Sequence, residues 1–112
     1  MPCNYISYIK FSIFMITTIT HKGLRLLFEE DNSSKVQSVH VEKLRNILTR
    51  LDNAESLSDL NYPGSGLHPL KGKLKDFWAL KVDKNYRVIF IFTEQKGEIF
   101  VEVSDVDYID YH

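Results

Sequence analysis

The sequence predicts an α+β fold in which two N-terminal helices pack on one face of a small, mainly antiparallel, curved sheet. Two observations predict this fold. Apolar residues recur with a helical period of about 3.6 residues between positions 36 and 54. Short β-rich segments joined by tight turns follow position 66. Because the two patterns occupy separate parts of the chain, helices and strands are expected to form separate layers.

Residues 1–14 are interpreted as an extension before a single domain of residues 15–112. The extension lacks the cationic start of a signal peptide, and Lys10 interrupts its apolar run. It is also too short and too polar to span a bilayer. We expect it either to be disordered or to add to a sheet edge. "MITTI" at 15–19 alternates in the way that predicts a short strand.

Two helices are expected next. In the first, "HKGLRLLFEE", Leu24, Leu27 and Phe28 fall on one face. "DNSS" at 31–34 predicts a turn that supplies the N-cap of the second helix, which runs from Val36 to about Ala54. The apolar stripe of the second helix comprises Val36, Val39, Leu44, Ile47, Leu48 and Leu51.

The second half of the chain predicts an antiparallel meander. "YPGSG" at 62–66 interrupts regular structure. Pro69 restricts "LHPLKG" to a sheet edge, because proline has no N–H to donate. "DFWALKV" and "YRVIFIFTE" predict strands joined by the tight turn "DKN", and the second is apolar on both faces, as in a central strand. A turn at "EQKGE" and a strand at "IFVEV" follow.

Composition limits the possible functions. The 112 residues carry a net charge of −1, which gives no overall field toward nucleic acid or membrane. Lys and Arg nevertheless dominate residues 68–87, and only acidic charges occur in 98–110. The basic stretch would suit phosphates, or it is a solvated strand face. Cys3 is the only cysteine, which excludes an intramolecular disulfide and fits a reducing cytoplasm.

Arg87 is the most informative polar residue, because it lies inside the most apolar strand. A buried arginine is rare unless it is paired or faces a ligand. If the helices pack on the face that carries Tyr86 and Val88, Arg87 points to the open face of the sheet. The alternative is an internal ion pair with Glu102 or Asp110.

The other candidates for chemistry follow the helices: His68, Lys71, Lys73, Asn85, Asp110, Tyr111 and His112. Metal-free cleavage of an RNA phosphodiester needs a base, an acid and cations to hold the crowded phosphate. Histidine and aspartate would carry the protons, and lysine and arginine would supply the positive charge. Tyr111 or Trp78 would stack on a base.

Two other interpretations of these residues remain. A metal site from His68, Asp110 and His112 is disfavoured, because the lysines and arginine nearby would repel a cation. Alternatively, the last residues form only a solvated acidic tail. In an extended strand, Asp110 and His112 would point to one side and Tyr111 to the other.

Four segments resemble the HigB-like toxins of the RelE/ParE superfamily of type II toxin–antitoxin modules: "GLRLLFEE", "HVEKLRNILTRLDNAESLSDLNYPGSGLHPLKG", "FWALKVDKNYRVIF" and the terminal "DYH". The resemblance runs from about Met15 to His112. It implies a RelE-like fold, similar to that of microbial ribonucleases. It also implies ribosome-dependent mRNA cleavage that arrests growth. It further implies neutralisation by a HigA-like helix-turn-helix antitoxin, and the toxin would bind operator DNA only through this antitoxin.

The resemblance also implies roles for single residues. Proton transfer falls to His68, Asp110 and His112, without a choice between base and acid, and Arg87 steadies the phosphate. The remaining implied site residues are Tyr111 in the terminal triad, Asn85 beside Arg87, and Lys71, Lys73 and Lys75, which would help to hold RNA. No cofactor is implied.

Two alternative functions stay open. A ParE-like, gyrase-inhibiting toxin would share the fold, but such proteins generally lack the His/Tyr/Asp cluster. A catalytically inactive RNA- or partner-binding module would use the basic stretch and not the terminal triad.

Overall fold

The computed structural model describes residues 16–95 and 100–111. The expectations for residues 1–15, for the turn at 96–99 and for His112 lie outside these residues. The described chain contains helices α2 (Lys22–Glu30) and α3 (Val41–Asp52) and strands β1 (His68–Pro69), β2 (Trp78–Lys81), β3 (Tyr86–Gln95) and β4 (Phe100–Asp110). Short 3₁₀ helices lie at Ser38–His40, Leu57–Leu60 and Gly72–Leu74.

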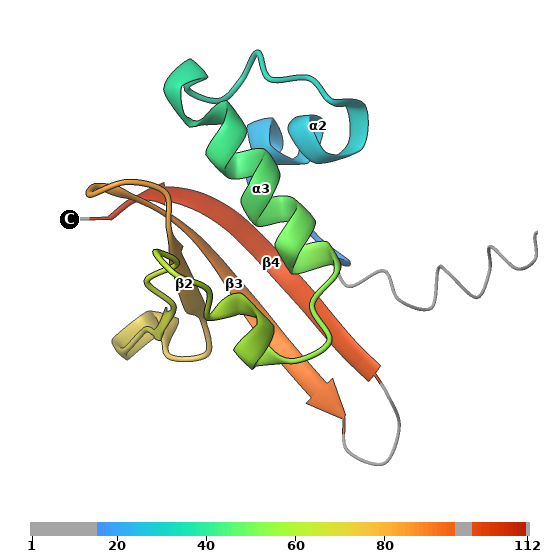
Figure 1. The fold of residues 1–112 in the computed structure, drawn as a ribbon, viewed down its shortest axis with the longest axis vertical. Coiled ribbons are helices and arrows are strands. Elements are labelled where there is room, and N and C mark those ends of the chain that lie inside the picture. The colour runs from blue at the N-terminus through green and yellow to red at the C-terminus, as the bar shows by residue number, and fades with distance from the viewer. Residues whose placement is uncertain (1–15, 96–99, 112) are drawn as a thin grey trace, which may run out of the picture.

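The strands form the predicted antiparallel meander, in the order β1-β2-β3-β4. Strand β3 is internal, and its ladder with β4 shifts register between Ile89 and Ile91. Such irregularities bend a strand pair, and the sheet is visibly curved in Figure 1. Strand β1 is the edge, as Pro69 predicts. Strand β4 continues to Asp110, well beyond the predicted "IFVEV".

The segment after Met15 pairs with β4 through isolated bridges, where a strand is predicted. Ile16 and Ile19 form parallel bridges with Val103 and Val106. The backbone N–H of Thr17 donates to the carbonyl oxygen of Val103 at 2.8 Å. The segment therefore covers the edge of β4 before the chain enters α2.

Helix α2 forms where the sequence predicts it. His21 is its N-cap, and its Nδ1 accepts a hydrogen bond from the backbone N–H of Leu24 at 3.0 Å. Leu24 and Leu27 are buried, but Phe28 is 36% exposed, so it lies outside the buried stripe. Gly23 is required by packing, because a Cβ there would lie 2.4 Å from the carbonyl oxygen of Lys35.

Helix α3 begins at Val41, so the predicted start at Val36 is wrong, as is the N-cap expected from "DNSS". The segment before it forms a 3₁₀ turn in which Val39 is 80% exposed. His40 is buried there, 4% exposed, and its contacts to distant residues hold this segment out of the helix. The predicted stripe of Leu44, Ile47, Leu48 and Leu51 is buried.

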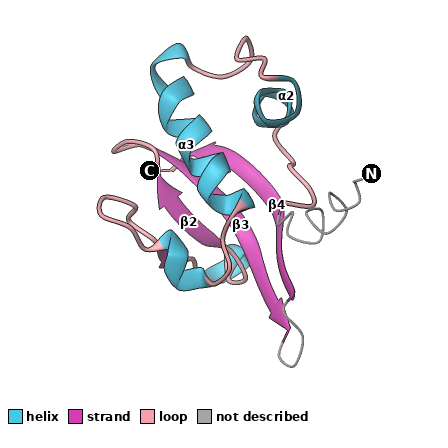
Figure 2. Cartoon of the chain, turned by 45° about the vertical axis from the view of Figure 1, so that its right-hand side comes forward, coloured by secondary structure: helices cyan, strands magenta, loops and turns pink. Residues whose placement is uncertain are grey.

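The two faces of the sheet have different covers. Helix α3 lies across one face with α2 packed beside it (Figures 1 and 2), and the main core forms between these layers. From β3, Val88 and Phe90 point into this core. A smaller cluster of Leu70, Ala79 and Ile89 lies on the opposite face. Strand β3 is therefore apolar on both faces, as predicted, and the α+β class is confirmed.

Candidate active site on the open face of the sheet

The ladder register places His68 and Arg87 on the face away from the helices. His68 pairs with Ala79, which belongs to the open-face cluster, and Arg87 pairs with Ile109, which packs against that cluster. Directly opposed residues of an antiparallel pair point to the same side of the sheet. The expectation that Arg87 points to the open face is therefore confirmed.

The ring of His68 is oriented by the preceding glycine. Gly66 has a φ of 61°, and its carbonyl oxygen lies 2.9 Å from Nδ1 of His68. A carbonyl oxygen only accepts, so Nδ1 carries the proton and donates it. In the neutral ring, the lone pair is then on Nε2. A histidine in this tautomer presents a proton acceptor at Nε2.

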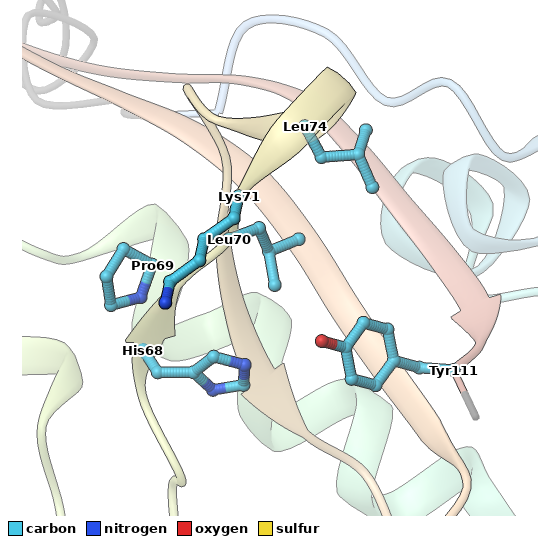
Figure 3. Close-up of a pocket in the computed structure, with 6 residues that line it drawn as sticks. All are labelled: His68, Pro69, Leu70, Lys71, Leu74 and Tyr111. Carbon is cyan, nitrogen blue, oxygen red and sulfur yellow. The ribbon is translucent and has the colours of Figure 1, made fainter.

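An open pocket of about 290 Å³ lies beside His68, lined by His68, Pro69, Leu70, Lys71, Leu74 and Tyr111. Figure 3 shows the imidazole of His68 and the ring of Tyr111 pointing toward each other across this space, with the side chain of Lys71 reaching toward His68. The ring centroids of His68 and Tyr111 are 6.3 Å apart. A histidine, a lysine and a tyrosine side chain thus share one pocket.

Arg87 borders this pocket through Tyr111. Its guanidinium carbon lies 5.5 Å from the centroid of the Tyr111 ring. Nη1 of Arg87 also donates to the carbonyl oxygens of Asp83 at 2.5 Å and Tyr86 at 3.0 Å. Glu102 lies opposite Thr93, far along the ladder, and accepts from the hydroxyl of Thr17, so the suggested ion pair of Arg87 with Glu102 is wrong.

Not all predicted residues reach the pocket. Asp110 pairs with Tyr86, so the register directs it to the side of the sheet opposite Arg87. Lys73 and Lys75 are exposed in and after the 3₁₀ helix Gly72–Leu74, outside the pocket lining. Asn85 contributes its backbone, because its carbonyl oxygen accepts from the N–H of Tyr111 at 2.6 Å.

A polar cluster formed by His40, Asp83 and Tyr108 was not predicted from the sequence. Nε2 of His40 lies 2.8 Å from Oδ2 of Asp83, and Nδ1 lies 2.5 Å from the Tyr108 hydroxyl. The hydrogen bond from His40, helped by the backbone N–H groups of Tyr86 and Asn85, lowers the pKa of Asp83 to about 2. Burial raises the pKa of the Tyr108 hydroxyl. The available signal was an aspartate at the start of a tight turn, which commonly caps that turn.

Within residues 16–95 and 100–111, no three His, Cys, Asp or Glu side chains gather as a metal site would require. Neither helix in this part of the chain has the length and apolar character needed to cross a bilayer.

A curved antiparallel sheet with helices on one face, and a basic, histidine-containing pocket on the other, is the arrangement that the resemblance to RelE-like toxins implies. The family model described as "RelE-like toxin of type II toxin-antitoxin system HigB" matches residues 17–112. The chain therefore belongs to the HigB-like toxin family. A toxin of a type II module implies an antitoxin as its partner.

Two relatives found by sequence agree with this assignment. The chain is 36% identical over 98 residues to "Endoribonuclease HigB" of Proteus vulgaris, which covers 88% of this chain and 100% of that protein. It is 35% identical over 71 residues to "Toxin HigB-1" of Vibrio cholerae serotype O1, covering 62% of this chain and 75% of the relative. Among solved structures, "YoeB/ParE toxin from Agrobacterium tumefaciens" gives a TM-score of 0.46 at 16% identity, covering 88% and 98% of the two chains.

Proposed function

We propose that this HigB-like toxin is an endoribonuclease that cleaves mRNA on the ribosome, at the pocket between β1 and the end of β4. The observation that carries the proposal is the convergence of His68, Lys71 and Tyr111 on one open pocket, with Arg87 against the Tyr111 ring. The name of the Proteus vulgaris relative supports the reaction class.

The proposed reaction transfers two protons. A base removes the proton of a ribose 2′-hydroxyl, the 2′-oxygen attacks the adjacent phosphorus, and the bond from phosphorus to the 5′-oxygen breaks. An acid protonates that 5′-oxygen, which leaves a 2′,3′-cyclic phosphate. His68 is one of the two proton carriers, and its Nε2 suits the base because Nδ1 is engaged by Gly66. His112 is proposed as the second carrier, because the register turns Asp110 to the side of the sheet opposite Arg87.

Cations would stabilise the charge that develops on the phosphate. Lys71 lines the pocket and Arg87 lies near the Tyr111 ring, which supports the proposal that both contact the phosphate. Lys73 and Lys75 are exposed beside the pocket and would hold RNA more distantly. Tyr111 is 38% exposed and would stack on a base. These groups supply proton transfer and positive charge without a metal ion.

The wider assignment follows from the family. We infer that residues 15–112 form one toxin domain and that residues 1–14 are an extension to it. The antitoxin is proposed to be a HigA-like helix-turn-helix protein, which alone would contact operator DNA. The ribosome would supply part of the RNA affinity, which suits a net charge of −1. We place the activity in the cytoplasm, where translating ribosomes occur.

The test is primer extension on mRNA bound to translating ribosomes, with purified protein. Wild-type protein should produce discrete cleavage sites, and His68→Ala should reduce the rate by about 10²-fold or more, as expected for loss of a proton carrier. Asp31→Asn is the matched control, because Asp31 is an exposed partner of Arg45 far from the pocket in sequence. Wild-type protein that leaves ribosome-bound mRNA intact but blocks gyrase supercoiling would contradict the proposal.

A further inference from the structure

The turn between β2 and β3, residues 82–86, is closed by several hydrogen bonds. The backbone N–H groups of Val82 and Asp83 donate to the carbonyl oxygen of Tyr86 at 2.9 and 3.3 Å. Oδ1 of Asp83 accepts from the backbone N–H groups of Asn85 and Tyr86, each at 2.8 Å. One carboxylate therefore fixes the backbone of the whole 82–86 turn.

The 82–86 turn holds two residues of the candidate site. Nη1 of Arg87 donates to the carbonyl oxygens of Asp83 and Tyr86. The backbone N–H of Tyr111 donates to the carbonyl oxygen of Asn85 at 2.6 Å. The positions of the Arg87 guanidinium and the Tyr111 ring therefore both depend on where the carbonyl groups of this turn point.

His40 ties the 82–86 turn to the helix layer. The second carboxylate oxygen of Asp83 accepts from Nε2 of His40 at 2.8 Å. Because this carboxylate is ionised at neutral pH, Nε2 carries a proton. In the neutral ring, Nδ1 accepts from the Tyr108 hydroxyl, 2.5 Å away. Tyr108 is buried in the main core, so His40 links the turn to a fixed point.

Packing restricts His40 further. Its ring centroid lies 5.0 Å from that of Tyr86 and 5.8 Å from that of Tyr108, nearly perpendicular to the latter. A buried histidine satisfied at both nitrogens has few alternative orientations. None of these groups lines the pocket. The proposed reaction therefore leaves their arrangement unexplained.

We propose that His40 and Asp83 are positioning residues of the toxin, which hold the 82–86 turn so that Arg87 and Tyr111 face the pocket. This inference rests on the proposed function and deepens it. Neither residue touches the phosphate. Asp83 acts through the carbonyl groups of the turn, and His40 acts through Asp83.

The activity test compares two substitutions of Asp83. Asp83→Ala removes the cap and the link to His40, and should lower the cleavage rate at saturating ribosomes by about 10- to 100-fold, as misplacement of a catalytic group does. Asp83→Asn keeps the Oδ1 acceptor and, with the other His40 tautomer, a hydrogen bond to Nε2, so it should remain within about threefold of wild type. Asp31→Asn serves again as the exposed-carboxylate control.

A double substitution distinguishes positioning from general destabilisation. If Asp83 acts largely through Arg87, adding Asp83→Ala to Arg87→Ala should slow cleavage much less than Asp83→Ala slows the wild-type protein. Fully multiplicative effects would overturn the inference. If Asp83→Ala fails to fold, Asp83→Ser replaces it in the comparison with Arg87→Ala. The serine hydroxyl is too short to reach His40, so this variant also removes the link to the helix layer.

A second readout does not depend on cleavage. In Asp83→Ala, NMR should show the Tyr111 amide exchanging with solvent about tenfold faster or more, while the Val88 amide in the core ladder stays protected. If wild-type protein cleaves no RNA, the proposed function fails and this measurement still tests the turn. An unchanged Tyr111 exchange rate would overturn the inference even if cleavage is confirmed.

Discussion

The backbone N–H of Tyr111 donates to the carbonyl oxygen of Asn85 at 2.6 Å, which ties the end of β4 to the turn between β2 and β3. The ends of strands usually fray, but this bond extends the ladder past Asp110. The Tyr111 ring centroid lies 6.3 Å from that of the His68 imidazole and 5.5 Å from the guanidinium carbon of Arg87. A solvated tail without contacts, one of the two alternatives from the sequence, does not describe Tyr111.

The first prediction concerns the Tyr111 side chain. Tyr111→Ala should weaken mRNA cleavage by roughly tenfold or more, mostly through KM, because stacking of a base on an aromatic ring contributes about 1–3 kcal/mol. Tyr111→Phe keeps the ring and should retain most of the activity. Cleavage kinetics on programmed ribosomes measure both. If the phenylalanine variant is as slow as the alanine variant, the hydroxyl and not the ring is what matters.

The second prediction concerns stability in acid. Hydrogen bonds from His40 and from the turn lower the pKa of Asp83 to about 2, below its ordinary value of 3.8. Between these values the unfolded chain binds a proton that the folded chain does not, so this contribution is present above about pH 4 and is lost as pH falls toward 2. Asp83→Asn should therefore flatten the decrease in the free energy of unfolding over this range.

Denaturant titrations from pH 5 down to pH 2 measure this effect. Asp31→Asn removes a more exposed carboxylate. In this variant the free energy of unfolding should decrease with falling pH as it does in the wild-type protein. Parallel curves for wild type and Asp83→Asn across this range would mean that the carboxylate of Asp83 is not held by these hydrogen bonds in solution.

The third prediction concerns the approach of α2 to the following loop. A Cβ at Gly23 would lie 2.4 Å from the carbonyl oxygen of Lys35, a backbone atom that cannot rotate away. Gly23→Ala should lower the free energy of unfolding by about 1–3 kcal/mol, as overpacking does, although alanine ordinarily favours a helix. Thermal melting measures the loss. Glu29→Ala, on the exposed side of the same helix, is the control and should change stability little. If Gly23→Ala is as stable as the wild-type protein, the loop around Lys35 moves to make room for the Cβ.

The sequence predicts the open face of the sheet well, and for a physical reason. Side chains alternate along a regular strand, so once Val88 and Phe90 face the helices, Arg87 must face away. The same rule predicts that Asp110 and Tyr111 lie on opposite sides. Local alternation is fixed by the backbone and needs no knowledge of distant residues.

The sequence predicts the start of α3 poorly, because a distant contact decides it. The apolar pattern continues through Val36 and Val39, yet the helix begins at Val41. His40 instead binds Tyr108 and Asp83, which are 68 and 43 positions away. No local pattern encodes such a contact. The pocket has the same limit, because its two sides come from β1 and from the residue after β4.

The last prediction separates two lysines that the sequence treats alike. Lys71 and Lys73 are both exposed, but only Lys71 lines the pocket. Lys71→Ala should lower the cleavage rate at saturating ribosomes, because it removes a cation near the reacting phosphate. Lys73→Ala removes the same charge farther from the pocket. It should mainly raise KM and should make KM less dependent on salt concentration.

Rates at several ribosome concentrations, at low and moderate salt, measure this difference. Lys71→Arg keeps the charge in the pocket and should restore much of the rate. Equal losses of maximal rate for Lys71→Ala and Lys73→Ala would mean that the basic stretch acts only as a diffuse RNA-binding surface. Lys73, which lies outside the pocket, would then matter as much as Lys71, which lines it. The reaction centre would have to lie somewhere other than beside His68.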